Sequence, residues 1–180
     1  MLVKSTQQTY SGKLLDLNNP KIEDINIRDI AHSLSMICRF NGCVDKFYSV
    51  AEHSVKAYLL VKQENKLEAL LHDAVEAYIG DVTRPLKSLL PEYRAIELKW
   101  SKVISQKFGI PIKKSLEIKR IDGILQVTEF LKMMIRPDNL DSIPTPVSFE
   151  DADMTIEISN WTPLEAEQYF LECYREISEI

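Results

Sequence analysis

Apolar residues recur at steps of three and four along most of this chain, a spacing that gathers them on one face of an α-helix but not on one face of a β-strand. Ile27, Ile30, Leu34 and Ile37 form one such series, and the Asn-Gly pair at 41–42 is expected to end that helix. Gly accounts for five of 180 residues, too few for an all-β sandwich with many tight turns. The sequence therefore predicts an all-α irregular helical bundle, with further helices at about 49–63, 66–78, 91–109, 113–134 and 163–178.

Local signals support several of these helices. Ser49 is a suitable N-cap, with Glu52 as the acidic partner of a capping box, and Pro91 suits a first helical position. The inward face of the second helix is expected to carry Val50, His53, Ala57 and Leu60. The inward face of the last helix is expected to carry Leu164, Tyr169, Cys173 and Ile177.

Two stretches lack a helical pattern. Residues 1–25 hold turn signals and are expected to be extended or irregular. Residues 136–162 contain three prolines, which suggests a less regular excursion or a short strand pair. No repeat divides the chain, so we expect a single domain over 1–180.

The charge and the apolar runs exclude some partners. A net charge of −5 argues against a nucleic-acid partner, whose phosphate backbone requires basic stripes. No apolar stretch approaches the roughly 20 residues of a membrane span, and no secretory leader is evident, so a cytoplasmic protein without a membrane partner is expected. The three cysteines show no metal-binding spacing and are expected to be reduced thiols.

Four polar residues fall on apolar helix faces. His72 and Asp73 lie side by side in LLHDAVEAYIGDVTRPLK, His53 is on the inward face of the preceding helix, and Asp122 lies among Ile and Leu residues further on. A single inward histidine or aspartate is more often a hydrogen-bonded core residue than a ligand. A divalent cation would account for all four residues together. It would neutralise the aspartates and bind both imidazoles, which otherwise cost free energy to bury. Nitrogen and oxygen ligands without thiolate suit Co, Mn, Zn or Mg.

These residues also resemble a known signature. His53, then His72-Asp73, then Asp122 match the H…HD…D pattern of the HD-domain metal-dependent phosphohydrolases. The blocks FYSVAEHS, LLHDAVEAYIGDVTRPLK, LPEYRAIE and IKRIDGILQVTEF are similar to those of the small members related to bacterial 5′-deoxynucleotidases and to phage dATP triphosphohydrolases. The resemblance covers about 25–132 and implies a bundle of the HD-domain type.

The resemblance implies roles for further residues. Glu76 and Asp81 match acidic residues that assist proton transfer and position water, and Glu76 is also one helical turn beyond the predicted ligands. Arg39 and Phe40 resemble a pair that grips phosphate and crowds the sugar. Thr83 and Lys87 are further candidates for phosphate binding. His32 falls outside the metal pattern, and a structural role is favoured over a substrate contact.

The expected function is hydrolysis of a deoxynucleotide to its deoxynucleoside. Release of triphosphate from a dNTP, with dATP as the favoured substrate, stands beside a 5′-deoxynucleotidase activity on dNMPs. A non-catalytic nucleotide-binding module on the same scaffold is the alternative outside enzymes. The resemblance also implies a homo-oligomer, either a dimer or a hexamer.

Overall fold

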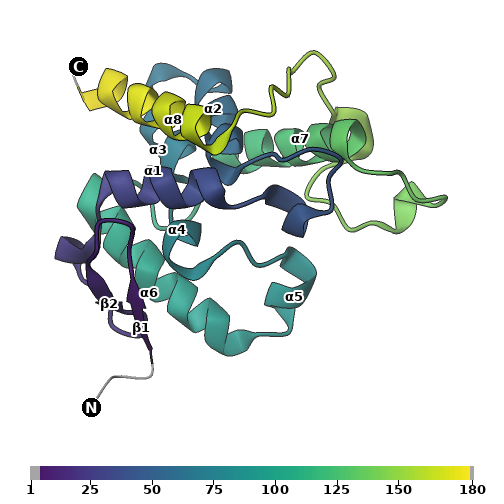
Figure 1. Cartoon of the computed structure of the whole chain (residues 1–180). Helices are drawn as coiled ribbons and strands as arrows, with labels where there is room; N and C mark the ends of the chain where they lie inside the picture. The colour runs from purple at the N-terminus through teal and green to yellow at the C-terminus, as the bar shows by residue number, and fades with distance from the viewer. Residues whose placement is uncertain (1–4, 179–180) are drawn as a thin grey trace.

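The computed structural model describes residues 5–178, and the chain within that range is mainly α-helical. It opens with a hairpin in which β1 (Thr6–Gln8) pairs antiparallel with β2 (Leu14–Asp16). Eight α-helices follow (Figure 1): α1 Ile27–Met36, α2 Val50–Leu60, α3 Lys66–Leu71, α4 Glu76–Ile79, α5 Arg84–Ser88, α6 Pro91–Phe108, α7 Leu116–Met133 and α8 Pro163–Ser178. The predicted all-α class is therefore confirmed. None of these helices combines the length and the low charge needed to cross a bilayer.

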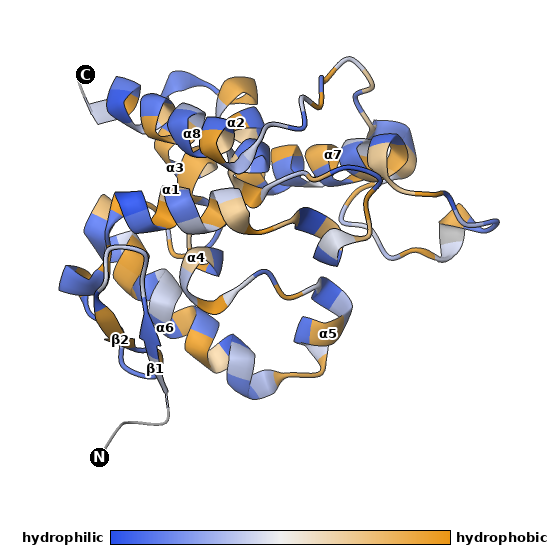
Figure 2. Cartoon of the chain, viewed as in Figure 1, coloured by the Kyte–Doolittle hydropathy of each residue, from blue (hydrophilic) through white to orange (hydrophobic). Residues whose placement is uncertain are grey.

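The C-terminal helix α8 closes the core over helices from the first half of the chain. In Figure 1, α8 lies across α1, α2 and α3, and it contacts all three. Figure 2 shows polar and apolar residues alternating along α6, α7 and α8, the pattern of helices buried on one side. Trp100 of α6 is fully buried, stacks on Tyr78 with ring centroids 4.4 Å apart, and donates a hydrogen bond to the Leu17 carbonyl.

Several helix ends and faces differ from the prediction. The first helix ends at Met36 rather than at 41–42, and a separate 3-10 turn covers Arg39–Gly42. In α2 the predicted inward residue Leu60 is 40% exposed, because the helix ends there. In α8 the inward face carries Ala166, Phe170 and Cys173, whereas Leu164 and Tyr169 are 64% and 43% exposed. The spacing predicted the correct elements, but Leu60 and Leu164 lie at helix ends beyond the packed face, and Tyr169 in the middle of α8 is partly exposed.

The predicted helix over 66–78 is interrupted at the residues of greatest interest. α3 ends at Leu71 and α4 begins at Glu76. In between, the amides of Ala74 and Glu76 donate to the carbonyls of Leu71 and Asp73, three residues back. Bonds of this spacing tighten the backbone and rotate the side chains relative to an α-helix. The break therefore sets the directions in which His72, Asp73 and Glu76 point.

The excursion over 136–162 contains 3-10 turns at Leu140–Ser142 and Phe149–Asp151 and no strand among its described residues. Buried Glu52 of α2 holds its far end by accepting hydrogen bonds from the amides of Ser159 and Trp161, both at 2.8 Å. Ser49 caps α2 as predicted, since its hydroxyl accepts a hydrogen bond from the Glu52 amide. The predicted capping box is wrong in its second half, because the Glu52 carboxylate binds the excursion instead.

The middle of the excursion packs closely on α7, where Pro146 and Val147 lie against Gly123. A methyl group at this position would lie 2.8 Å from Cγ1 of Val147 and 3.4 Å from Cγ of Pro146. Gly123→Ala is expected to lower the free energy of unfolding by about 1–2 kcal/mol, since the overpacking outweighs the helix preference of alanine. In a Val147→Ala background the same change should be neutral or stabilising by about 0.5–1 kcal/mol. Urea unfolding of the four proteins tests this, and equal effects of Gly123→Ala in both backgrounds would contradict the close contact.

Candidate metal centre and adjoining cavity

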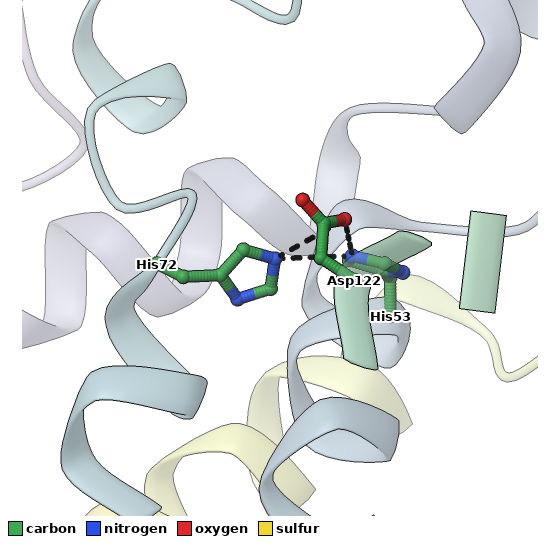
Figure 3. Close-up of side chains that lie close together, drawn as sticks. All are labelled: His53, His72 and Asp122. Carbon is green, nitrogen blue, oxygen red and sulfur yellow. Dashed lines mark hydrogen bonds and ion pairs between the residues drawn. The ribbon is translucent and has the colours of Figure 1, made fainter. Parts of the chain in front are cut away.

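Three predicted ligands converge from three helical elements. His53 lies on α2, His72 at the end of α3 and Asp122 on α7, and one ligand atom of each lies within 4.8 Å of the others. The two Nε2 atoms are 3.1 Å apart, and Oδ1 of Asp122 is 3.3 Å from Nε2 of His53 and 3.8 Å from that of His72 (Figure 3). Both imidazoles are fully enclosed, with 0% of either side chain exposed. This group is able to hold a metal ion.

The hydrogen bond at Nδ1 of each imidazole determines whether its Nε2 carries a proton or a lone pair. Nδ1 of His53 lies 2.6 Å from a carboxylate oxygen of Glu129, and Nδ1 of His72 lies 2.6 Å from the carbonyl oxygen of Ala69. Because both partners are acceptors, each Nδ1 carries the proton. In neutral imidazoles the two Nε2 lone pairs then face one another and need a cation between them. Such outer hydrogen bonds are the usual support for histidines that bind metals.

The charged groups around His53 and Asp122 favour a positive charge between these two residues and His72. Burial and Arg39 act to lower the pKa of His53, but Glu129 and Asp122 outweigh them and raise it. Burial also acts to raise the pKa of Asp122, yet Lys114 and the two histidines hold it far below its usual range. The carboxylate is therefore ionised and available to a cation.

The fourth predicted ligand, Asp73, lies beside this group. Its Oδ2 is 3.1 Å from Nε2 of His72 and 3.7 Å from Nε2 of His53. Its other oxygen, Oδ1, accepts a hydrogen bond of 2.9 Å from the ammonium group of Lys114. That same ammonium donates to Oδ2 of Asp122 at 2.7 Å. Each aspartate thus directs one oxygen to the imidazoles and the other to Lys114.

Glu129 binds His53 at Nδ1, the ring nitrogen that faces away from the other predicted ligands. This fully buried residue of α7 accepts hydrogen bonds from Nδ1 of His53, from the Tyr48 hydroxyl at 2.8 Å and from Nε of Arg39 at 2.9 Å. Burial alone would raise the pKa of Glu129, but Arg39 and His53 hold it below its usual value. Arg39, predicted to grip phosphate, is therefore an ion-pair partner of Glu129, and its exposed fraction is 9%.

The two predicted acid–base residues, Glu76 and Asp81, have raised pKa values, in contrast to Asp122 and Glu129. Oε2 of Glu76 is buried and has no hydrogen-bond partner among the described residues. Burial, followed by the charges of Asp73 and Asp81, holds the pKa of Glu76 well above its usual range. Burial also raises the pKa of Asp81. A buried carboxyl group with a raised pKa and no partner is a candidate for proton transfer.

A cavity of about 710 Å³ opens beside these groups. Its wall includes His72, Asp73, Asp122, Glu76 and Asp81, together with all four predicted substrate-binding residues, Arg39, Phe40, Thr83 and Lys87. Phe40 has a left-handed backbone with φ of 54°, uncommon outside glycine, and its ring lies 5.4 Å from the Arg39 guanidinium. Lys87 is paired with Glu97 at 2.6 Å. The structure thus gathers every predicted site residue in and around one cavity.

Comparison with known proteins places the chain in a family. No family model matches it. Over 177 residues it is 39% identical to the uncharacterized protein YfdR of Escherichia coli, an alignment that covers 96% of each chain. The chain belongs to the YfdR family. An uncharacterized protein of Rhodobacter capsulatus is 37% identical over 127 residues, which is 65% of each chain.

In this member of the YfdR family, sequence analysis missed two residues of the centre. Glu129 follows Asp122 by seven residues, two helical turns, so the shared face of α7 was a usable signal. Lys114 lies in the loop before α7, where no periodicity relates it to Asp73 or Asp122.

The third histidine of this YfdR-family chain lies outside the centre. The ring of His32 stacks on Tyr10 with centroids 3.5 Å apart, and its Nδ1 is 2.9 Å from a carboxylate oxygen of Glu167. His32 is therefore bound between the N-terminal hairpin and α8, in agreement with the favoured structural role.

Proposed function

We propose that this protein is a metal-dependent phosphohydrolase of the HD-domain type that converts deoxynucleotides to deoxynucleosides. One observation carries the proposal. Two enclosed imidazoles, each with Nδ1 engaged by an acceptor, bring their Nε2 atoms to 3.1 Å from one another and to 3.3 and 3.8 Å from Asp122, beside a cavity of about 710 Å³. His53, His72, Asp122 and Asp73 would hold the ion, and the absence of thiolate among them suits Co, Mn, Zn or Mg.

A divalent ion at this place would supply Lewis acidity toward a phosphoryl oxygen and lower the pKa of water. Glu76, with its unpartnered Oε2, is the residue that accepts a proton from the attacking water. Asp81 lines the same cavity, and its raised pKa suits a second site for that proton. The two carboxyl groups differ from Asp73 and Asp122, whose pKa values are lowered. Neighbouring carboxyl groups with different pKa values take different roles: those with raised pKa values carry protons, and those with lowered pKa values bind the cation.

The remaining wall suits a nucleotide with several phosphates. Five cationic side chains line the cavity, namely Arg39, Arg84, Lys87, Arg94 and Lys114. Phe40, Phe130 and Ile143 add apolar surface for the sugar and base. Arg39, Lys87 and Lys114 already pair with carboxylates, whereas Arg84 and Arg94 form no ion pair among the described residues. These two further cations favour a dNTP, with release of triphosphate, over a dNMP, whose single phosphate needs fewer partners.

The test is a product assay on the wild type and on matched histidine variants. Purified protein is incubated with each dNTP, dNMP and rNTP in the presence of Co, Mn, Zn or Mg, and products are separated by chromatography. We expect deoxyadenosine and triphosphate from dATP, with activity removed by a chelator and restored by metal. His53→Ala should be inactive and bind less metal, whereas His32→Ala, which changes the histidine outside the centre, should retain activity.

The other outcomes discriminate between the alternatives. Deoxynucleoside from dNMPs alone would replace the proposal with a 5′-deoxynucleotidase. Metal binding without turnover of any nucleotide would favour a non-catalytic binding module. Absence of metal binding in calorimetry would overturn the proposal altogether.

A further inference from the structure

Lys114 is placed between the two carboxylates of the candidate metal centre. Its Nζ lies 2.9 Å from Oδ1 of Asp73 and 2.7 Å from Oδ2 of Asp122, and 30% of its side chain is exposed to the cavity it lines. The ammonium group of Lys114 thus forms an ion pair with each acidic ligand, on the side away from the imidazoles.

The loop that carries Lys114 is held in place on its C-terminal side. Ser115 caps α7 through its hydroxyl, which accepts a hydrogen bond from the Ile118 amide. The Ser115 amide in turn donates to a carboxylate oxygen of Glu68 on α3 at 2.6 Å. The backbone next to Lys114 is therefore bound to α7, which carries Asp122, and to α3, which ends two residues before Asp73, so the ammonium does not depend on a flexible loop for its position.

The charges of the contacting groups lead to the inference. Asp73 and Asp122 contribute two negative charges, while Glu129 is balanced by Arg39, which lies 2.9 Å from Glu129 and 3.8 Å from Asp73. With Lys114 the two carboxylates and the ammonium sum to −1, so a bound dication would leave a net charge of +1. Without Lys114 the sum would be −2, and the same dication would leave the site neutral. We propose that Lys114 gives the metal-loaded centre an excess positive charge that draws a phosphate group to it, at the expense of metal affinity.

This inference rests on the proposed function for the identity of the anion, but it also predicts the sign of the change in metal affinity when Lys114 is removed. A cation that only positioned the aspartates would strengthen metal binding, and its removal would weaken it. A cation that sets the charge would repel the metal, and its removal would strengthen metal binding while weakening the binding of an anion. The two roles of Lys114 therefore predict opposite changes in metal affinity.

Calorimetry on the full chain tests the sign. Mn²⁺ is titrated into the metal-free wild type, Lys114→Met and Lys114→Arg, and inorganic phosphate and tripolyphosphate are then titrated into each Mn²⁺-loaded protein. We expect Lys114→Met to bind Mn²⁺ at least about tenfold more tightly and the phosphates at least about tenfold more weakly. Lys114→Arg, which keeps the charge, should stay near the wild type and shows that the position tolerates substitution. Lys113→Met removes the same charge from an exposed neighbour and should change neither affinity.

The result that overturns the inference is an unchanged or weaker Mn²⁺ affinity, or an unchanged phosphate affinity, in folded Lys114→Met. If Lys114→Met does not fold, as judged by circular dichroism, Lys114→Gln replaces it under the same criteria. If the wild type binds Mn²⁺ and phosphate but hydrolyses no nucleotide, the proposed function is overturned, and the expected changes in Lys114→Met would still support this inference. Wild type that binds no divalent metal would overturn both.

Discussion

Replacing Glu129 by alanine is expected to lower the free energy of unfolding by about 3–5 kcal/mol, because it removes the nearest counter-charge of the buried Arg39 guanidinium. Glu129 is fully buried and accepts hydrogen bonds from Arg39, His53 and Tyr48 at 2.9, 2.6 and 2.8 Å. Its removal therefore leaves three donors without this acceptor, and the remaining ion pair of Arg39 is the longer one to Asp73 at 3.8 Å. Urea-induced unfolding of the metal-free proteins measures the loss directly.

Two further variants separate the causes of this loss. Glu129→Gln retains the volume and one acceptor oxygen but not the charge, so its stability should lie between the wild type and the alanine variant. Glu172→Ala, an exposed glutamate of α8, should change stability by no more than about 0.5 kcal/mol. We also expect Glu129→Ala to weaken metal binding about 10–100-fold, since Nδ1 of His53 loses the partner that fixes its proton. A loss of stability below about 1 kcal/mol would show that the ion pair is not a support of the fold.

The comparison of sequence with structure shows where periodicity is sufficient. Helices α1, α2 and α8 were predicted from apolar residues on one face, and α6 and α7 from Pro91, Gly109 and Pro111 near their ends. The break at 72–75 was not predicted, since LLHDAVEAYI continues the helical pattern while its backbone adopts three-residue hydrogen bonds. Local propensity does not determine that choice. The tertiary contacts of His72 and Asp73 determine it.

The site shows the same division. His53, His72, Asp73 and Asp122 were found because polar groups on apolar faces require an explanation. Lys114 was missed because a loop lysine carries no such contradiction. The charge partners of Arg39 and Lys87 were missed because glutamates 90 and ten residues away become neighbours only in three dimensions. Sequence therefore indicated the residue types of the centre, whereas the state of each charge required the fold.

Under the proposed function, Glu76→Gln is expected to lower kcat on a deoxynucleotide about 10²–10⁴-fold, because it removes the group proposed to accept the proton of the attacking water. Metal affinity should stay near the wild type, since Glu76 does not belong to the group of ligand atoms around His53. Glu92→Gln, an exposed residue in the first turn of α6, should retain full activity as the matched control.

The stability of Glu76→Gln supplies a second readout with its own sign. The buried Oε2 of Glu76 has no partner among the described residues, and burial together with Asp73 and Asp81 raises the pKa of Glu76. An acid held in this state costs free energy of folding, so a neutral amide should unfold at a temperature no lower than the wild type. Loss of activity without loss of stability is the pattern of a residue retained for chemistry rather than for the fold. A structural Glu76 would give the reverse, with the melting temperature lowered and kcat within about threefold of the wild type.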